Sequence, residues 1–202
     1  MKFKEFKNIQ VAALEDSVEY FTNSKKQERE LWVAREFLRR YVPEVELAEI
    51  RPVKADPPDV RFRDINFEIK EILDEGYRRH AQYKRELQVA RSAMKYADFV
   101  KDVDVNKRVP LDGFIQKVET HVTSYRKDHS KEFMASIDAL YYVNLRGILA
   151  RKICAPLVPP SGLRDSGFRS ISLLFNDGTL VIAATSVAPA LIRDNCGHLY
   201  RS

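Results

Sequence analysis

The sequence predicts an α/β fold of mixed α+β character, in a single domain that spans residues 1–202. The chain has 202 residues, of which 45% are hydrophobic and 31% charged, which is typical of a globular domain that buries its own core. Apolar residues recur at helical spacing in some segments and alternate with polar residues in others. Short polar turns near positions 63 and 177 separate alternating segments, which favours two β-hairpins.

The N-terminal part of the chain is predicted to be helical. Apolar side chains recur at helical spacing over residues 6–21, which favours an amphipathic helix. A second helix is expected to begin after residues 22–24, where Thr, Asn or Ser could cap it, and to end at Pro43. Residues 45–53 then favour a strand, and the Asp-Pro-Pro cluster that follows them indicates a turn.

The next segment predicts a β-hairpin with its turn at Arg63 and Asp64. Side chains alternate between the two faces of a strand, so five apolar residues share one face: Val60, Phe62, Ile65, Phe67 and Ile69. Five polar residues share the other face: Asp59, Arg61, Asn66, Glu68 and Lys70. In this register Asp59 lies opposite Glu68, which brings two carboxylates together.

Helices and strands alternate again beyond this hairpin. Long helices are predicted over residues 76–100 and 111–127, and a buried strand over residues 137–145. Turn formers over residues 156–167 indicate a loop. A closing hairpin is predicted over approximately 168–185, because apolar segments flank an Asn-Asp-Gly turn.

The polar face of the first hairpin has the composition of a metal site. Two carboxylates at directly opposed positions repel each other unless a cation lies between them. Asp59 and Glu68 therefore suit Mg²⁺, which prefers oxygen ligands and keeps several waters. Lys70 shares this face, where its ammonium could orient a metal-bound water, stabilise developing phosphate charge or act as a base. This chemistry is typical of phosphodiester hydrolysis.

The same residues resemble a known family. Pro58-Asp59, eight intervening residues and Glu68-Ile69-Lys70 resemble the PD-(D/E)xK signature of the restriction-endonuclease-like superfamily. The resemblance implies a core of a helix, a three-stranded meander, a helix and a strand, over approximately residues 25–145. The N-terminal helix and the C-terminal hairpin would be additions to that core. The whole chain is similar to bacterial proteins that are grouped as endonucleases on fold grounds and have no assigned substrate.

The resemblance also implies roles for individual residues. Asp59, Glu68 and the backbone carbonyl of Ile69 would bind Mg²⁺ or Mn²⁺, and Lys70 would activate or position water. A glutamate on the preceding helix would assist, with Glu30 as the first candidate and Glu36 as the alternative. The implied function is that of an enzyme, a metal-dependent phosphodiesterase or endonuclease that acts on nucleic acid.

A basic segment follows the hairpin and suggests how nucleic acid could bind. The formal net charge is +5, which permits a polyanionic partner. Lys84, Arg91 and Lys95 are spaced along one side of the predicted helix and could contact successive phosphates, with DNA favoured over RNA. The alternative is a solvated helix face.

Other classes of function are also open at this point. The polar side of the hairpin could be solvated surface, and the chain could be a non-catalytic module that binds nucleic acid or protein. The four histidines have no partners at metal-ligand spacing and are expected to be surface or capping residues: His80, His121, His129 and His198. We expect a cytoplasmic protein, because no apolar segment is typical of a signal peptide or a membrane span. A homo-oligomer is permitted, and the sequence does not define the oligomeric state.

Overall fold

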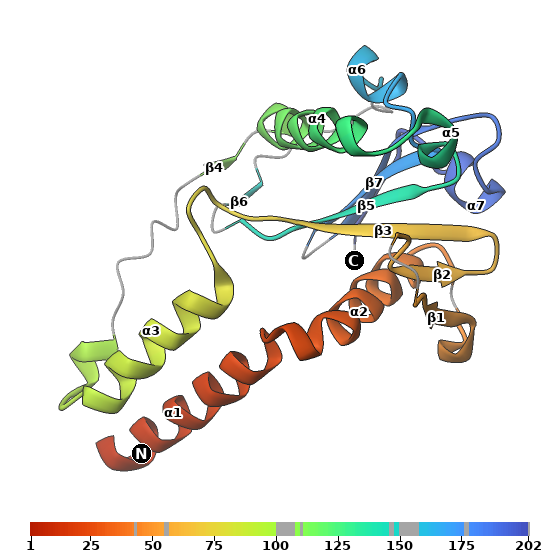
Figure 1. Cartoon of the computed structure of the whole chain (residues 1–202). Helices are drawn as coiled ribbons and strands as arrows, with labels where there is room; N and C mark the ends of the chain where they lie inside the picture. Colours follow the sequence, from red (N-terminus) through yellow and green to blue (C-terminus); the bar gives the residue numbers. More distant parts are fainter. Residues whose placement is uncertain are drawn as a thin grey trace.

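A mixed seven-stranded sheet forms the centre of the protein, shown as a computed structural model in Figure 1. Its strands, in spatial order, are β1 (Ile50–Pro52), β2 (Val60–Phe62), β3 (Ile65–Ile72), β5 (Asp138–Val143), β7 (Ser170–Phe175), β8 (Gly178–Ala184) and β9 (Leu199–Arg201). β3, β5 and β7 are parallel, and the other neighbours are antiparallel. The structure describes residues 1–42, 44–54, 57–99, 108–109, 111–145, 148–149, 158–175 and 178–201.

Helices lie on both sides of this sheet. The α-helices are α1 (Phe3–Tyr20), α2 (Lys26–Leu38), α3 (Arg79–Ser92), α4 (Leu111–Asp128), α5 (Lys131–Met134), α6 (Ser161–Arg164) and α7 (Ala190–Arg193). Short 3-10 turns are η1 (Asn23–Lys25), η2 (Leu47–Glu49) and η3 (Tyr96–Phe99), and β4 (Arg108–Val109) pairs with β6 (Ile148–Leu149). In Figure 1, α2 lies below the sheet, and α4 and α5 lie above it. Among the helices of the described residues, none has both the length and the apolar character needed to cross a membrane.

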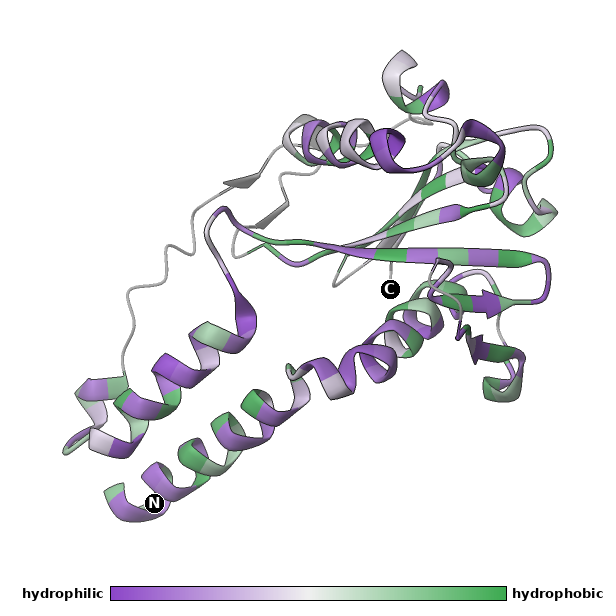
Figure 2. Cartoon of the chain, in the orientation of Figure 1, coloured by the Kyte–Doolittle hydropathy of each residue, from purple (hydrophilic) through white to green (hydrophobic). Residues whose placement is uncertain are grey.

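Two hydrophobic cores hold these layers together. The core under α2 includes all five apolar residues of the first hairpin: Val60, Phe62, Ile65, Phe67 and Ile69. The core under α4 includes Ile72 of β3 and Tyr141 of β5. Figure 2 shows the corresponding alternation of apolar and polar residues along β3. The predicted apolar face of the hairpin is therefore confirmed. Successive side chains of a strand point to opposite faces of the sheet, and the five apolar side chains all point to the face that α2 covers.

The turn of the first hairpin lies at the predicted place. Phe62 pairs with Ile65, which leaves Arg63 and Asp64 as the two turn residues. Arg63 adopts a φ of 52°, in the left-handed region that a residue with a side chain rarely enters. Its guanidinium binds the Glu49 carboxylate at 2.8 Å and lies over the Phe62 ring, and these contacts hold the turn in place.

A helical arm, formed by α1, α3 and η3, projects from the sheet (Figure 1). Phe3 and Phe6 of α1 pack against the rings of Tyr96 and Phe99 in η3. No residue of α1 is fully buried, so the arm is a pair of helices that is exposed on most sides. The mostly purple colour of α3 in Figure 2 reflects its polar composition.

Most of the predicted elements are present. The first two predicted helices are confirmed as α1 and α2, and the strand predicted at residues 137–145 is confirmed as β5. The predicted meander is confirmed as the antiparallel strands β1, β2 and β3. The closing hairpin is confirmed as the antiparallel pair of β7 and β8. The helix at residues 111–127 is confirmed as α4. The turn of the closing hairpin, at residues 176–177, lies outside the described residues.

Several boundaries were wrong. The segment 45–53 forms a strand only from Ile50, because η2 occupies the residues before it. The helix predicted over residues 76–100 runs only from Arg79 to Ser92, and residue 100 lies outside the described residues. No side chain caps α2, because η1 precedes it and Lys25 takes the N-cap position. The predicted loop contains α6, and β9 and α7 were not predicted.

Candidate active site

The carboxylate of Asp59 is held at the edge of β3. Asp59 directly precedes β2 and is 5% exposed. Its backbone N–H donates to the Phe67 carbonyl at 2.9 Å, and its Oδ2 accepts a hydrogen bond of 2.8 Å from the Ile69 N–H. Its Oδ1 lies 3.3 Å from Nζ of Lys26 on α2. These contacts join the start of β2, the middle of β3 and the first turn of α2.

Glu30 of α2 shares this environment. Lys26 Nζ lies 3.2 Å from Glu30 Oε1, so one ammonium contacts both Glu30 and Asp59. Burial and then the nearby Asp59 carboxylate raise the pKa of Glu30 to about 7, against the opposite effect of Lys26. Burial disfavours the charged form of Lys26, but the two carboxylates outweigh it and raise the pKa of Lys26. A cation is therefore strongly favoured between these two carboxylates.

Glu68 and Lys70 form an ion pair on β3. Lys70 Nζ lies 2.6 Å from Glu68 Oε1, and the Glu68 side chain is only 3% exposed. On the side of α4, burial and then the charge of Glu68 raise the pKa of Tyr141. The Tyr141 hydroxyl lies 2.8 Å from Nδ1 of His121, whose pKa is lowered by burial and by Lys70. A titratable cluster thus extends from β3 through β5 to α4.

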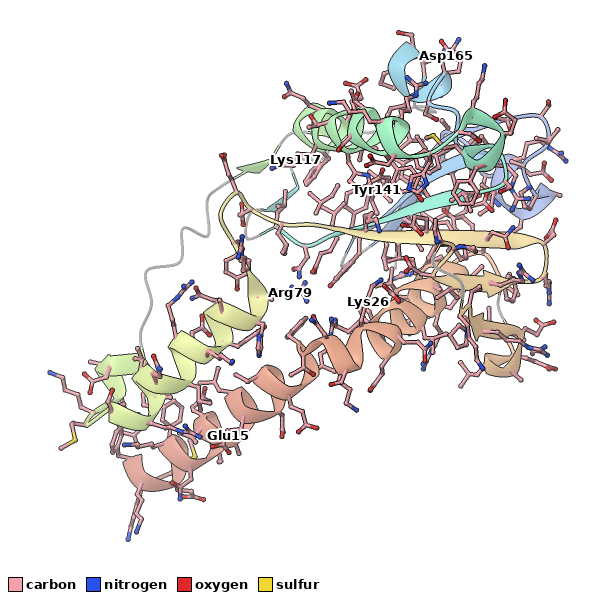
Figure 3. The ribbon with its side chains drawn as sticks, viewed as in Figure 1. Glu15, Lys26, Arg79, Lys117, Tyr141 and Asp165 are labelled. Atoms are coloured by element: carbon pink, nitrogen blue, oxygen red, sulfur yellow. The ribbon has the colours of Figure 1, made fainter. Side chains whose placement is uncertain are left out.

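A cavity of about 370 Å³ lies next to these groups. Its polar lining comprises Lys26, Arg29, Glu30, Lys70, Glu71 and Arg79, and its apolar lining comprises Tyr20, Phe21, Trp32, Val33, Ile69 and Tyr142. In Figure 3, Lys26 and Arg79 lie on the lower side of β3, and Tyr141 lies on the upper side, towards α4. Lys26 and Glu30 line the cavity, and Lys26 also contacts Asp59. Lys70 lines the cavity and contacts Glu68. Asp59 and Glu68 are therefore each linked to the cavity through a lysine.

The sequence matches one family model along almost its whole length. The model describes a "Putative endonuclease, protein of unknown function (DUF1780)" and matches residues 4–202. The chain belongs to this family. The match supports the class of function that the sequence suggested and does not itself identify a metal or a mechanism.

A solved structure has a similar fold. It is of a protein of unknown function from Pseudomonas aeruginosa strain PAO1, described as a member of the monooxygenase superfamily. The two chains are 21% identical with a TM-score of 0.67, over 100% of this chain and 97% of the other. At this identity the likeness shows a shared fold alone. None of the curated proteins matches this member of the DUF1780 family significantly.

The structure gives each predicted site residue of this DUF1780 member a definite place. Glu30 and Asp59 contact the same lysine, and Lys70 borders the same cavity as Glu30. Glu68 is buried beside Lys70. The alternative helix carboxylate, Glu36, pairs instead with Arg39 at 2.8 Å.

Two details of the predicted geometry differ. Asp59 precedes the regular ladder of β2, so its carboxylate binds the backbone of β3 instead of standing as a regular cross-strand partner of Glu68. Ile69 contacts Asp59 through its N–H, whereas its carbonyl was the expected metal ligand. Within the described ranges, no group of three or more His, Cys, Asp or Glu side chains is arranged to hold a metal ion.

Sequence reasoning missed Lys26 and His121. Lys26 is four residues before Glu30, and this helical spacing is the signal that could have identified it. His121 was expected at the surface or at a helix cap, but it is half-buried and bonded to Tyr141. Its environment depends on the packing of α4 on β5, which no local pattern shows.

The predicted basic stripe is not continuous. Lys84 is exposed on α3, as expected. Arg91 pairs with Glu15 of α1 at 2.7 Å, so part of its charge is compensated within the arm. Lys95 lies beyond the end of α3 at Ser92, so the spacing of an uninterrupted helix does not apply to it. The stripe was wrong in its third position because the helix is shorter than predicted.

The pKa of Glu30 predicts a pH-dependent effect on stability. In the unfolded chain the Glu30 pKa returns to about 4.5, whereas in the folded protein it is about 7. The folded state therefore binds more protons between these values, and its stability decreases as the pH rises from about 4.5 to 7. Glu30→Gln cannot ionise, so we expect it to raise the free energy of unfolding by about 1 kcal/mol at pH 8 and by less at pH 5.

Urea unfolding at both pH values, with a chelator present, measures this effect. Glu36→Gln is the matched control on the same helix. Among the described ion pairs, Glu36 contacts only the exposed side chain of Arg39. A Glu30→Gln protein that is less stable than wild type at pH 8 would contradict the prediction and would show that the ion pair with Lys26 dominates.

Proposed function

We propose that this protein is a metal-dependent phosphodiesterase that cleaves nucleic acid. The observation that carries the proposal is the pair of carboxylates, Glu30 and Asp59, bridged by the ammonium of Lys26 at 3.2 and 3.3 Å. The PD-(D/E)xK resemblance, the order of α2, the meander, α4 and β5, and the endonuclease description of the family support the same class.

The donor chemistry at this site suits Mg²⁺ or Mn²⁺. Mg²⁺ is commonly bound by one or two carboxylates, with waters and substrate phosphate as the other ligands. Glu30 and Asp59 would hold it, and Glu68 would act through its ion pair with Lys70. When bound, the ion would polarise the phosphate and lower the pKa of a coordinated water. Lys26 neutralises the carboxylates in the free protein, which is the role that a divalent ion would take over.

The remaining residues would position the reacting groups. Glu68 orients the Lys70 ammonium, which could then stabilise the negative charge that develops on the scissile phosphate. Asp59 is fixed by the Ile69 N–H, so its carboxylate keeps its direction without a bound ion.

Binding of the nucleic acid would use positive charge outside the site as well. The exposed Lys84, Lys95 and, in part, Arg91 lie on or beside α3 and could contact phosphates, with DNA favoured over RNA. Such contacts contribute affinity that does not depend on sequence and decreases with salt. The arm would then hold the strand while the sheet edge presents the carboxylates.

Cleavage assays with defined substrates test this function. The purified protein is incubated with plasmid DNA, linear duplex, single-stranded DNA and RNA, each with Mg²⁺, with Mn²⁺ or with EDTA. We expect cleavage of at least one substrate only when a divalent ion is present. A folded protein that cleaves none of the substrates with either ion would overturn the enzymatic function, and salt-dependent binding without cleavage would favour the non-catalytic alternative.

A further inference from the structure

The cavity beside the carboxylates has aromatic walls that the phosphodiesterase function does not require. Tyr20 and Phe21 come from the end of α1, Trp32 from α2 and Tyr142 from β5. The Trp32 and Tyr142 rings are 5.5 Å apart at an interplanar angle of 76°. Trp32 remains 38% exposed, although it is one of the largest apolar side chains and its ring contacts Tyr142, which packs against the core under α2. These rings form an open apolar recess and not a closed core.

Two arginines are fixed among these rings. The Arg79 guanidinium lies 4.7 Å from the centre of the Phe21 ring and 5.6 Å from that of Tyr142, and its side chain is only 14% exposed. Arg29 lies 5.4 Å from the Phe21 ring and donates a hydrogen bond of 2.9 Å to the Thr22 carbonyl. Guanidinium planes and aromatic rings are the two surfaces on which unstacked nucleobases pack in proteins.

Cationic side chains of the lining could contact a phosphate, and two of them, Lys26 and Lys70, also pair with the carboxylates of Asp59 and Glu68 just outside the lining. Among the described residues that line the cavity, four are cationic (Lys26, Arg29, Lys70, Arg79) and two are acidic (Glu30, Glu71). Arg79 is ion-paired with Glu71, which lies on the same strand as Lys70. The cavity volume of about 370 Å³ is within the range of pockets for small organic groups, roughly 300 to 1,000 Å³. A ligand with a flat ring and a phosphate matches both parts of this lining.

We propose that this cavity receives one unpaired base of the substrate, so that the protein acts on single-stranded nucleic acid or on an unpaired nucleotide. The inference rests on the proposed phosphodiesterase function and specifies its substrate. A base inside a duplex is stacked between its neighbours and cannot enter a recess without being extruded. A base stacked on the exposed Trp32 ring, beside Tyr142, would place its own phosphate near Lys26 and Lys70, which border the same cavity.

The single tryptophan of the chain makes the proposal directly measurable. Trp32 is the only tryptophan in the sequence, so the intrinsic fluorescence of the protein reports on this cavity. Asp59→Asn protein, with EDTA present, is titrated with a short single-stranded oligonucleotide, with the corresponding duplex, and with a single strand that lacks bases. We expect the normal single strand to quench Trp32 fluorescence and to bind at least about 10-fold more tightly than either comparison, since each stacked base adds that order of affinity.

Two alanine variants and one control variant separate stacking from general electrostatic binding. With a labelled single strand and fluorescence anisotropy as the readout, Trp32→Ala and Tyr142→Ala should each weaken binding by about 10-fold, whereas Tyr142→Phe should bind as wild type because it keeps the ring. Trp32 is partly exposed, so its replacement keeps the test available if Tyr142→Ala does not fold. The duplex should bind all these variants with unchanged affinity.

The outcomes distinguish this inference from the function on which it rests. Equal affinity for single strand, duplex and baseless strand, or no loss in Trp32→Ala, would overturn the base-binding cavity even if wild-type protein cleaves DNA. Selective quenching by the single strand in a protein that never cleaves would support the cavity and overturn the phosphodiesterase. Quenching by free nucleotides alone, with no affinity for the strand, would identify a small-molecule site and overturn the inference.

Discussion

Replacing Asp59 by Asn should reduce metal-dependent cleavage on the order of 1,000-fold while leaving the protein folded. Asparagine keeps a side-chain oxygen that can accept the Ile69 N–H, so the local backbone contact at β3 is preserved. It removes the negative charge that, with Glu30, would hold the divalent ion. Initial cleavage rates at several Mg²⁺ concentrations measure the effect, and thermal unfolding verifies the fold.

Glu36→Gln is the control for this experiment. Glu36 lies on α2 like Glu30, but it pairs with Arg39 and does not line the cavity. Its replacement should leave the cleavage rate within about twofold of wild type, because Glu36 lies outside the cavity and contacts neither Asp59 nor Lys26 in the described ion pairs. Equal rates for wild type and Asp59→Asn would assign the observed cleavage to another site or to a contaminating nuclease.

Replacing Lys70 by Met should lower the free energy of unfolding by about 2 kcal/mol, and adding Glu68→Gln should restore most of that loss. The Glu68 carboxylate is 3% exposed and lies 2.6 Å from the Lys70 ammonium, so the single replacement removes the nearest positive charge from a buried anion. The double replacement leaves two neutral side chains of similar size. We place the effect below that of a fully buried pair because Lys70 is about one-third exposed.

Denaturant unfolding of the four proteins in this double-mutant cycle provides the measurement. A coupling free energy near zero, with each variant as stable as wild type, would contradict the ion pair. An effect of the Lys70→Met variant on cleavage alone, without loss of stability, would instead assign Lys70 to the reaction and not to the support of Glu68.

Local patterns were sufficient for the elements that build the sheet around the site. The alternation from Val60 to Ile69 predicted the hairpin, its turn at Arg63 and its buried face, and the structure confirms all three. The pattern is informative because α2 packs on one face of the hairpin, and the hairpin residues in the core on that face are apolar. Helix ends were less predictable: α3 stops at Ser92 and the chain turns back in η3 to pack its rings on α1, which is a contact between distant segments.

The sequence alone indicated the residues that we propose for the chemistry: Asp59, Glu68 and Lys70 on one hairpin. The family resemblance added a glutamate on the helix before it. Only the tertiary structure distinguishes Glu30, which shares Lys26 with Asp59, from Glu36, which pairs with Arg39, because these contacts depend on how α2 is rotated against β3. It also decided that Lys26 bridges the carboxylates and that rings from α1, α2 and β5 line one cavity. Spacing along a chain defines the face of a helix or strand, but convergence of faces from separate elements is a property of their packing.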